Sequence, residues 1–281
     1  MQSPTTLFFT DLDGSLLDHH SYSFAPAQPA LDRLRDAGFP LVLTTSKTLA
    51  EVVEINHALK NQAPVIVENG GAICFPKTIA YPFEIAAHEQ RDGHAVIRFS
   101  PPYSQIRHFI QAQRERSGPQ LRGFGDMSDT EVAEETGLGA DAASRARQRL
   151  CSEPFTWLVD ESRLDAFRQA AVEEGLRITR GGRYWHLMGD TSKAEAMRAL
   201  ALLYLGGLEQ TGTLVALGDS ENDREMLQRS DIAVVIRRPD LSHLDCHGIR
   251  QTIVTEEPGP AGWNSAVLQI LDQIAPGHPS A

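Results

Sequence analysis

Short apolar runs alternate with amphipathic stretches near the N-terminus of the chain. The runs at 7–10, 40–45 and 64–69 are apolar almost throughout, which is typical of strands buried on both faces of a parallel sheet. The stretches 26–37 and 48–59 lie between them, and their spacing and flanking Pro and Gly residues predict helices. This β-α-β-α-β order with short connections predicts a doubly wound parallel sheet.

The alternation stops in the middle of the chain and resumes toward its end. Residues 72–83 indicate an antiparallel hairpin, and the stretch 85–187 mixes hairpins with helices. Helices and buried strands alternate again after it. We therefore predict an α/β fold in which 1–84 and 188–281 form a Rossmann-like, doubly wound parallel-sheet core, and 85–187 form an inserted α+β cap domain.

Composition and charge narrow the possible classes of protein. The chain has 281 residues and a net charge of −11, which argues against a protein that binds nucleic acid or an anionic membrane. No window approaches eighteen uninterrupted apolar residues, and the N-terminus has no basic and apolar signal segment. The three cysteines are dispersed and form no CxxC pair, so we expect reduced thiols and a cytoplasmic location.

The first candidate site is DLDGS, which follows the first predicted strand directly. Ligands of open α/β sheets bind at the carboxyl ends of the strands. There Asp11 can attack phosphorus and form an aspartyl-phosphate, and Asp13 can protonate the leaving oxygen and later activate water. Gly14 allows a tight turn beside the phosphate. The alternative is an ordinary acidic surface turn, which the apolar strand before it makes less favourable.

A second pair of carboxylates follows another buried strand. Asp219 and Asp223 are one helical turn apart in GDSENDREM. Mg²⁺ prefers a few hard oxygen ligands, and Asp11, Asp219 and the backbone carbonyl of Asp13 would supply such a set. Asp223 would hold the metal through a water or orient the loop. The alternative is a capped helix with acidic residues in its first turn. That alternative does not explain why two separate strands end in Asp.

Two further segments carry groups suited to phosphate. Thr45 and Ser46 follow the second strand and can donate hydroxyl and backbone N–H hydrogen bonds to a phosphoryl oxygen near a helix N-terminus. Lys193 can offset the charge that develops on a transferring phosphoryl group. Taken alone, the first segment is equally well explained as a helix cap, and the lysine as a solvated side chain.

These segments occur in the order of the four motifs of the haloacid dehalogenase superfamily, and the mixed insertion resembles the cap of its type IIB (Cof-like) members. A narrower set of segments resembles the mannosyl-3-phosphoglycerate phosphatase family: TTSKTLAEV, VENGGAI, GFGDMSDTEVAEETGL, SEPF and GGRYWHLMG. Most Cof-like enzymes carry TGR where this chain has Thr45-Ser46-Lys47. The resemblance covers nearly the whole chain.

The resemblance implies roles for individual residues of this sequence. Asp11 would be the nucleophile and Asp13 the acid/base. Thr45 or Ser46, together with Lys193, would bind the phosphate. The metal would be Mg²⁺, with Asp11, Asp13, Asp219 and Asp223 as its candidate ligands.

The implied substrate is a small, anionic glycosyl-3-phosphoglycerate, which also carries a carboxylate and a sugar. Arg suits a bidentate carboxylate contact, and glycines allow close approach of the backbone. We therefore expect the segment Arg180-Gly181-Gly182-Arg183 to receive the carboxylate, with Lys47 as a second candidate cation. The alternative for this segment is an ordinary hairpin turn. Trp185 and His186 would border the sugar or fill structural positions.

Several functions remain open at this point. The leading interpretation is hydrolysis of mannosyl-3-phosphoglycerate to mannosylglycerate, a compatible solute by family resemblance. A phosphatase of another sugar phosphate, such as glucosyl-3-phosphoglycerate, is the first alternative, and a phosphomutase is the second. A non-catalytic sensor of a phosphorylated ligand should have lost a nucleophile, a metal ligand or the lysine, and all are present. The sequence does not indicate an oligomeric state.

Overall fold

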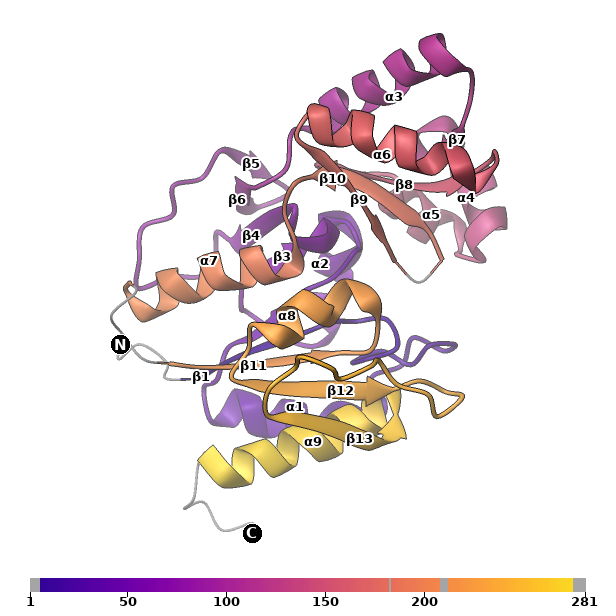
Figure 1. Cartoon of the computed structure of the whole chain (residues 1–281). Coiled ribbons are helices and arrows are strands. Elements are labelled where there is room, and N and C mark those ends of the chain that lie inside the picture. The colour runs from indigo at the N-terminus through magenta and orange to yellow at the C-terminus, as the bar shows by residue number, and fades with distance from the viewer. Residues whose placement is uncertain (1–5, 182, 208–211, 275–281) are drawn as a thin grey trace.

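A computed structural model describes residues 6–181, 183–207 and 212–274. A parallel sheet of five strands forms the centre of the larger part of the molecule, in the order β13-β12-β11-β1-β2 (Figure 1). This confirms the predicted α/β class. The strands are β1 (Thr6–Thr10), β2 (Leu41–Leu43), β11 (Thr213–Gly218), β12 (Ile232–Arg237) and β13 (Thr252–Pro258).

Helices cover both faces of this sheet because successive strand residues point to opposite sides. Phe8 packs into one apolar cluster, whereas Phe9 packs into the other. The first cluster includes side chains of α1, α2 and α9, and the second includes side chains of α7 and α8. The helices of this part are η1 (Ala25–Ala27), α1 (Gln28–Asp36), α2 (Leu49–Ala58), α7 (Lys193–Leu205), η5 (Glu221–Asp223), α8 (Arg224–Gln228) and α9 (Gly259–Ile274).

Four antiparallel strands continue from the edge of the parallel sheet. A single parallel bridge between Thr44 and Ile66 joins β3 to the strand before it. The order from there is β3-β4-β6-β5. The elements are β3 (Val65–Val67), η2 (Glu68–Gly70), β4 (Ala72–Pro76), β5 (Glu89–Arg91) and β6 (His94–Arg98).

This arrangement differs from the expected hairpin at 72–83. β4 pairs with β3 and β6, so its partners come from outside that segment. The predicted boundary at residue 84 would also assign β5 and β6 to the cap, although they pair with β4. We therefore propose that the core reaches to the end of β6 and that the cap begins after it.

The cap is a second layered unit above the core (Figure 1). Its antiparallel sheet has the order β7-β8-β10-β9. Apolar side chains of α3 and α6, among them Phe109 and Phe167, pack with Phe155 and Leu187 of the sheet. The elements are α3 (Tyr103–Ser117), β7 (Leu121–Gly123), η3 (Phe124–Asp126), α4 (Asp129–Thr136), α5 (Ala140–Ala146), β8 (Ser152–Trp157), η4 (Glu161–Arg163), α6 (Leu164–Glu173), β9 (Leu176–Arg180) and β10 (Trp185–Gly189).

The two segments that connect core and cap touch each other. The amide of Gly189 donates a hydrogen bond of 2.8 Å to Ser100 Oγ, which in turn donates one of 2.6 Å to the carbonyl of Cys151. A Cβ atom on Gly189 would lie 2.7 Å from Ser100 Cα. Only glycine therefore allows the two segments to approach this closely.

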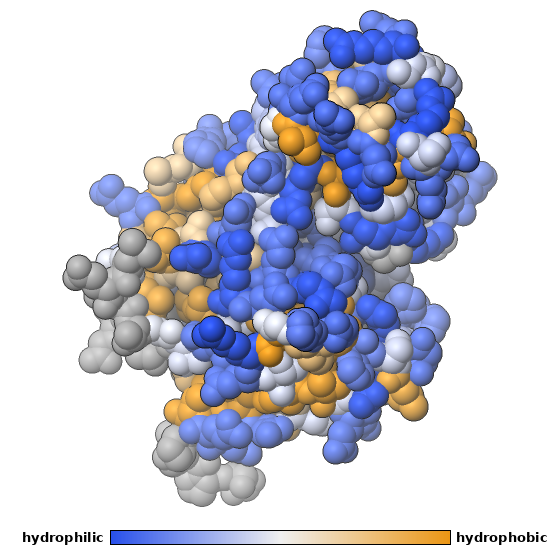
Figure 2. All heavy atoms as spheres, viewed as in Figure 1, coloured by the Kyte–Doolittle hydropathy of each residue, from blue (hydrophilic) through white to orange (hydrophobic). Residues whose placement is uncertain are grey.

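Hydrophilic and apolar residues are distributed unevenly over the surface. The face in Figure 2 is mostly hydrophilic over the cap, and apolar residues gather beside α7 on the core. Tyr81, Phe83 and Ile85 are partly buried against the apolar cluster beneath α7. None of the helices within the described ranges is long and apolar enough to cross a membrane.

Candidate active site

Asp11 lies directly after β1, at the carboxyl end of the central sheet. Its amide donates a hydrogen bond of 2.9 Å to the carbonyl of Leu217 on the neighbouring strand. Its carbonyl accepts one of 2.8 Å from Thr10 Oγ1, which itself accepts one of 2.9 Å from Trp263 Nε1. Trp263 is fully buried, so this chain of hydrogen bonds fixes the backbone at Asp11 from beneath the sheet.

Lys193 is the first residue of α7, and its ammonium group reaches back to the carboxylates. Nζ lies 2.6 Å from Asp11 Oδ1 and 2.7 Å from Asp223 Oδ1. Burial lowers the pKa of Lys193, but the attraction of the two carboxylates outweighs this and raises it above its usual range. The lysine is therefore a fixed positive charge beside Asp11. From the sequence we expected Lys193 to bind the phosphate, and its pairing with Asp11 and Asp223 is seen only in the structure.

The loop after β11 is held together by hydrogen bonds within the second carboxylate segment, 218–223. Asp223 Oδ2 accepts hydrogen bonds of 3.1 Å from the amides of Asp219 and Ser220, while its other oxygen meets Lys193. Oδ1 of Asp219 is shielded from solvent and accepts no hydrogen bond from a described residue. Burial and the nearby Asp223 raise the pKa of Asp219 to about 7, and Arg238 and Lys193 oppose this. Asp223 thus organises the loop, and Asp219 keeps an oxygen available.

Gly14 allows the turn after Asp13 to pass close to Asp219. Its φ is +79°, and a Cβ atom there would lie 3.0 Å from Asp219 Oδ2. The neighbouring Asp13 forms an ion pair of 2.9 Å with Lys47. Lys47 Nζ also lies 5.3 Å from the centre of the Tyr22 ring. Burial lowers the pKa of Lys47, but Asp13 outweighs this and raises it above its usual range.

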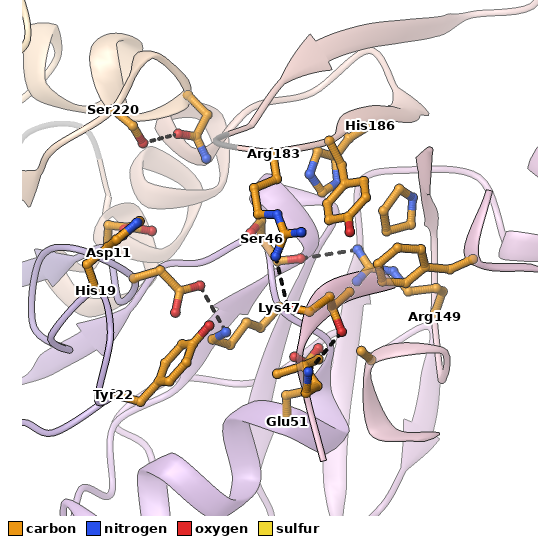
Figure 3. A pocket seen from close by; sticks show the side chains of 18 of the residues that line it. Asp11, His19, Tyr22, Ser46, Lys47, Glu51, Arg149, Arg183, His186 and Ser220 are labelled. Carbon is orange, nitrogen blue, oxygen red and sulfur yellow. Dashed lines mark hydrogen bonds and ion pairs between the residues drawn. The ribbon is translucent and has the colours of Figure 1, made fainter. Parts of the chain in front are cut away.

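A cavity of about 240 Å³ lies above these groups, with walls from both core and cap (Figure 3). The core supplies Asp11, Asp13, His19, Tyr22, Ser46, Lys47, Glu51, Asp219, Ser220 and Asn222. The cap supplies Phe124, Thr136, Leu138, Ala146, Arg149, Pro154, Arg183, Tyr184 and His186.

The motif after β2 is divided between the cavity and the interior. Ser46 and Lys47 line the cavity, whereas Thr45 is fully buried and does not. Thr45 Oγ1 accepts a hydrogen bond of 3.2 Å from the amide of Lys47, and Thr48 caps α2. The side chain of Thr45 therefore shapes the loop, and Ser46 is the hydroxyl at the cavity wall.

The hairpin segment of the cap is placed differently from the prediction. Arg180 and Gly181 do not line the cavity, and the guanidinium of Arg180 lies 4.6 Å from the centre of the Trp185 ring. Gly182 lies outside the described residues. Arg183 does line the cavity.

Two further polar residues of the cap, Arg149 and His186, line the cavity. His186 alternates along β10 with Trp185 and Leu187, which pack toward α3 and α6, so it faces the core. That alternation is visible in the sequence. Arg149 has no comparable signal, because it lies in the connection between α5 and β8, and the sequence analysis missed it.

Known proteins match this chain both in its N-terminal third and over nearly its full length. Residues 8–96 match the family described as haloacid dehalogenase-like hydrolase. A glucosyl-3-phosphoglycerate/mannosyl-3-phosphoglycerate phosphatase of Methanococcoides burtonii is 37% identical over 265 residues, 94% of this chain and 97% of that protein. The chain belongs to this phosphatase family. A phosphatase of the same name from Persephonella marina is also 37% identical, over 96% of this chain and 99% of its own.

Solved structures confirm the fold of this haloacid dehalogenase-like phosphatase. A Thermoplasma acidophilum protein has a TM-score of 0.65 at 20% identity, over 96% of this chain and 98% of its own. A sugar phosphatase of haloacid dehalogenase subclass IIB has a TM-score of 0.63 at 14% identity, over 95% of this chain and 99% of its own. The chain thus has the fold of that subclass IIB structure, including the inserted cap that the sequence predicted.

Phosphatases of this superfamily use a divalent metal, and the carboxylates fit one. Oxygens of Asp11, Asp219 and Asp223 lie within 4.8 Å of one another. Burial raises the pKa of Asp11 well above its usual range, Lys193 opposes this, and the neighbouring carboxylates add to it. A divalent cation would offset this excess of negative charge. Because both oxygens of Asp223 already accept hydrogen bonds, Asp11 and Asp219 are the better direct ligands.

His186 makes folding sensitive to acid. Burial lowers its pKa to about 3, and Arg149 and Lys193 add to this. The unfolded chain protonates His186 near its ordinary pKa of about 6.5, so it binds more protons than the folded chain below that pH. The free energy of unfolding should therefore fall between pH 6.5 and 3, by up to about 1.4 kcal/mol per pH unit from this residue.

Urea unfolding from pH 7 to 4.5 measures this slope. His186→Asn should have a shallower slope than the wild type, and the matched change at exposed His57 should leave it unaltered. Equal slopes for the wild type and His186→Asn would contradict the assignment.

Proposed function

We propose that this protein hydrolyses glycosyl-3-phosphoglycerates, with mannosyl or glucosyl groups, to the glycosylglycerate and phosphate, and that Mg²⁺ is its metal. The observation that carries the proposal is the position of Asp11, held against Lys193 at the floor of the cavity. Two relatives named for both substrates, at 37% identity over nearly the full chain, support the choice of substrate.

In the proposed first step, a carboxylate oxygen of Asp11 attacks phosphorus. The bond between phosphorus and the glycerate oxygen breaks, and Asp13 donates a proton to the leaving oxygen. Lys193 stays charged beside Asp11, so it stabilises the negative charge of the phosphoryl oxygens. The product of this step is an aspartyl-phosphate on residue 11.

In the proposed second step, water attacks the phosphorus of the aspartyl-phosphate. Asp13 removes the proton of this water, the bond to Asp11 breaks, and phosphate leaves. The contact of 2.9 Å between Lys47 Nζ and Asp13 Oδ2 holds this carboxyl group at the cavity, as a hydrogen bond while Asp13 is protonated and as an ion pair after it has given up its proton. The Ser46 hydroxyl at the cavity wall is placed to bind a phosphoryl oxygen. The cap side chains cover the opposite wall and limit the entry of further water.

Asp11 and Asp219, with the carbonyl of Asp13, would hold Mg²⁺, and Asp223 would orient their loop. When bound, the cation adds positive charge next to the phosphoryl oxygens. The dispersed cysteines and the negative charge favour a cytoplasmic protein with a small anionic substrate and no nucleic-acid partner.

Phosphate release from a panel of sugar phosphates tests the proposal. The metal-depleted protein should be inactive, and added Mg²⁺ should restore hydrolysis. Mannosyl- and glucosyl-3-phosphoglycerate should be cleaved at least about tenfold more efficiently than hexose phosphates or 3-phosphoglycerate. Only these two substrates would contact both the phosphate site and the cap residues of the cavity. Equal rates across the panel would overturn the substrate class. Binding without turnover would instead indicate a sensor.

A further inference from the structure

A glycosyl-3-phosphoglycerate carries a second anion, the carboxylate, which needs a cation in the cavity. Most cations there already have partners. Lys193 pairs with Asp11 and Asp223, and Lys47 pairs with Asp13. The phosphate end of the cavity therefore has its own counter-charges, and the carboxylate requires a separate one.

Arg183 is also committed at its guanidinium. Nη1 and Nη2 donate hydrogen bonds of 2.8 Å to the carbonyls of Thr136 and Glu135. These contacts fasten the β9–β10 connection to the end of α4. Arg180 lies against Trp185 and does not line the cavity. Of the arginines that line the cavity, Arg149 remains.

The guanidinium of Arg149 is held rigidly at the cavity wall. Its side chain is only 3% exposed. Nη2 donates to Ser152 Oγ at 2.6 Å and to the carbonyl of Ser46 at 3.1 Å, and Nε donates to the carbonyl of Ser152 at 3.2 Å. Nη1 has no hydrogen-bond partner among the described residues and is not among the polar atoms sealed from solvent. One nitrogen of the guanidinium, Nη1, is thus left to donate hydrogen bonds to a ligand.

Arg149 forms an ion pair with the buried Glu68, but this contact is made through Nε and leaves Nη1 without a partner among the described residues. The nearest contact of Glu68 with Arg149 is 3.5 Å, to Nε, on the other side of the guanidinium. The carboxylate of Glu68 already accepts hydrogen bonds from the amides of Leu150 and Cys151 and from Ser152 Oγ. Glu68 therefore anchors the segment that carries Arg149 to the core.

The position of Arg149 suits the geometry of a phosphoglycerate. Its hydrogen bond to the Ser46 carbonyl places the guanidinium beside the loop proposed to bind phosphate (Figure 3). In the substrate, the carboxylate and the phosphate are attached to a three-carbon unit, so their binding groups must be neighbours. Because Nη2 and Nε already have partners, Nη1 would donate a charge-assisted hydrogen bond to the carboxylate.

A second group faces the same wall. His186 is 6% exposed, lines the cavity, and its Nδ1 has no hydrogen-bond partner among the described residues. A buried polar atom without a partner at a cavity wall indicates a missing ligand group. Arg149 and His186 together form a polar wall of the cap next to the core site.

We infer that Arg149 binds the carboxylate of the substrate and sets the preference for phosphoglycerates over phosphate esters without a carboxylate. This inference rests on the proposed function. It takes Arg149 as the carboxylate-binding residue in place of the segment 180–183 and of Lys47. The guanidinium is oriented before the substrate arrives, so the contact needs no rearrangement of the cap.

Two substrates that differ at one group test the inference. Glucosyl-3-phosphoglycerate carries the carboxylate, and 2-O-glucosylglycerol 3-phosphate carries a hydroxymethyl group in its place. The ratio of their kcat/KM values does not depend on the fraction of active protein. Arg149→Met should reduce this ratio about 100-fold, because it removes one partner of a buried charged contact. Arg149→Lys should keep part of the wild-type ratio, because the positive charge remains but the planar guanidinium group is lost.

Arg122→Met is the matched control, since this arginine lies on the exposed side of the cap in an ion pair with Glu131, and its ratio should equal that of the wild type. If Arg149→Met does not fold, Arg149→Lys, which keeps a cation beside Glu68, carries the comparison.

The outcomes separate the two proposals. A wild-type ratio near one overturns the proposed substrate class together with this inference. If the wild-type ratio is high and Arg149→Met keeps it, the inference alone is overturned. The inference is also overturned if Arg180→Met lowers the ratio to about one. An equal loss on both substrates also overturns it, because Arg149 would then only position the Ser46 loop.

Discussion

Asp11→Asn is expected to reduce phosphate release by about 10⁴-fold or more, because the amide keeps the size of the side chain but cannot act as the nucleophile. The fold should survive, since the backbone hydrogen bonds of residue 11 to Leu217 and Thr10 do not involve its side chain. Steady-state phosphate release measures turnover. Rapid-quench mass spectrometry measures whether the peptide that contains residue 11 becomes phosphorylated.

The wild type should carry a transient phosphoryl group on the peptide that contains residue 11, and Asp11→Asn should carry none. The same substitution at exposed Asp36 is the control and should leave turnover unchanged. Turnover of Asp11→Asn within tenfold of the wild type would exclude Asp11 as the nucleophile.

Lys193→Met is expected to impair both activity and stability. The variant leaves Asp11 and Asp223 buried without their cation, and breaking a buried pair costs about 3–5 kcal/mol. Activity should fall about 10³-fold, because the phosphoryl charge also loses a fixed partner. Urea unfolding and phosphate release measure the two effects, and Lys77→Met, at an exposed lysine, is the control.

A double variant separates the two roles of Lys193. Adding Asp223→Asn to Lys193→Met removes one of the unpaired buried charges, so part of the lost stability should return. Activity should stay low, because the ammonium group beside Asp11 is still missing. A double variant that regains activity with stability would show that Lys193 acts only through the fold.

The sequence predicts the central sheet and the two carboxylate segments at its edge well, because those signals are local. The apolar strands before Asp11 and Asp219 and the first turn of α7 at Lys193 can each be recognised within ten residues. Where parallel strands end is also where their side chains meet, so the grouping of the carboxylates follows from topology.

Features that depend on distant partners were predicted poorly. β4 pairs with β6, twenty residues away, and no pattern within 72–83 reveals that choice. Arg149 faces the cavity because Glu68, about eighty positions earlier, holds the segment after it. Arg180, beside two glycines, is a reasonable candidate for carboxylate binding from the local sequence. In the structure its guanidinium lies against the ring of Trp185, its neighbour across the hairpin. The helix α4, in contrast, has a local signal in the sequence, because Ser128 and Glu131 have the spacing of a capping box.

The contact between Ser100 and Gly189 has a consequence for how such proteins diversify. Because the chain leaves and re-enters the core at nearly one point, the cap is a module whose ends are already joined by a hydrogen bond. A module of that kind can be lengthened, exchanged or deleted without changing the spacing of the core strands. The catalytic core can thus be inherited unchanged while the insert is replaced, and a short bridge across this point is the natural place to graft another cap.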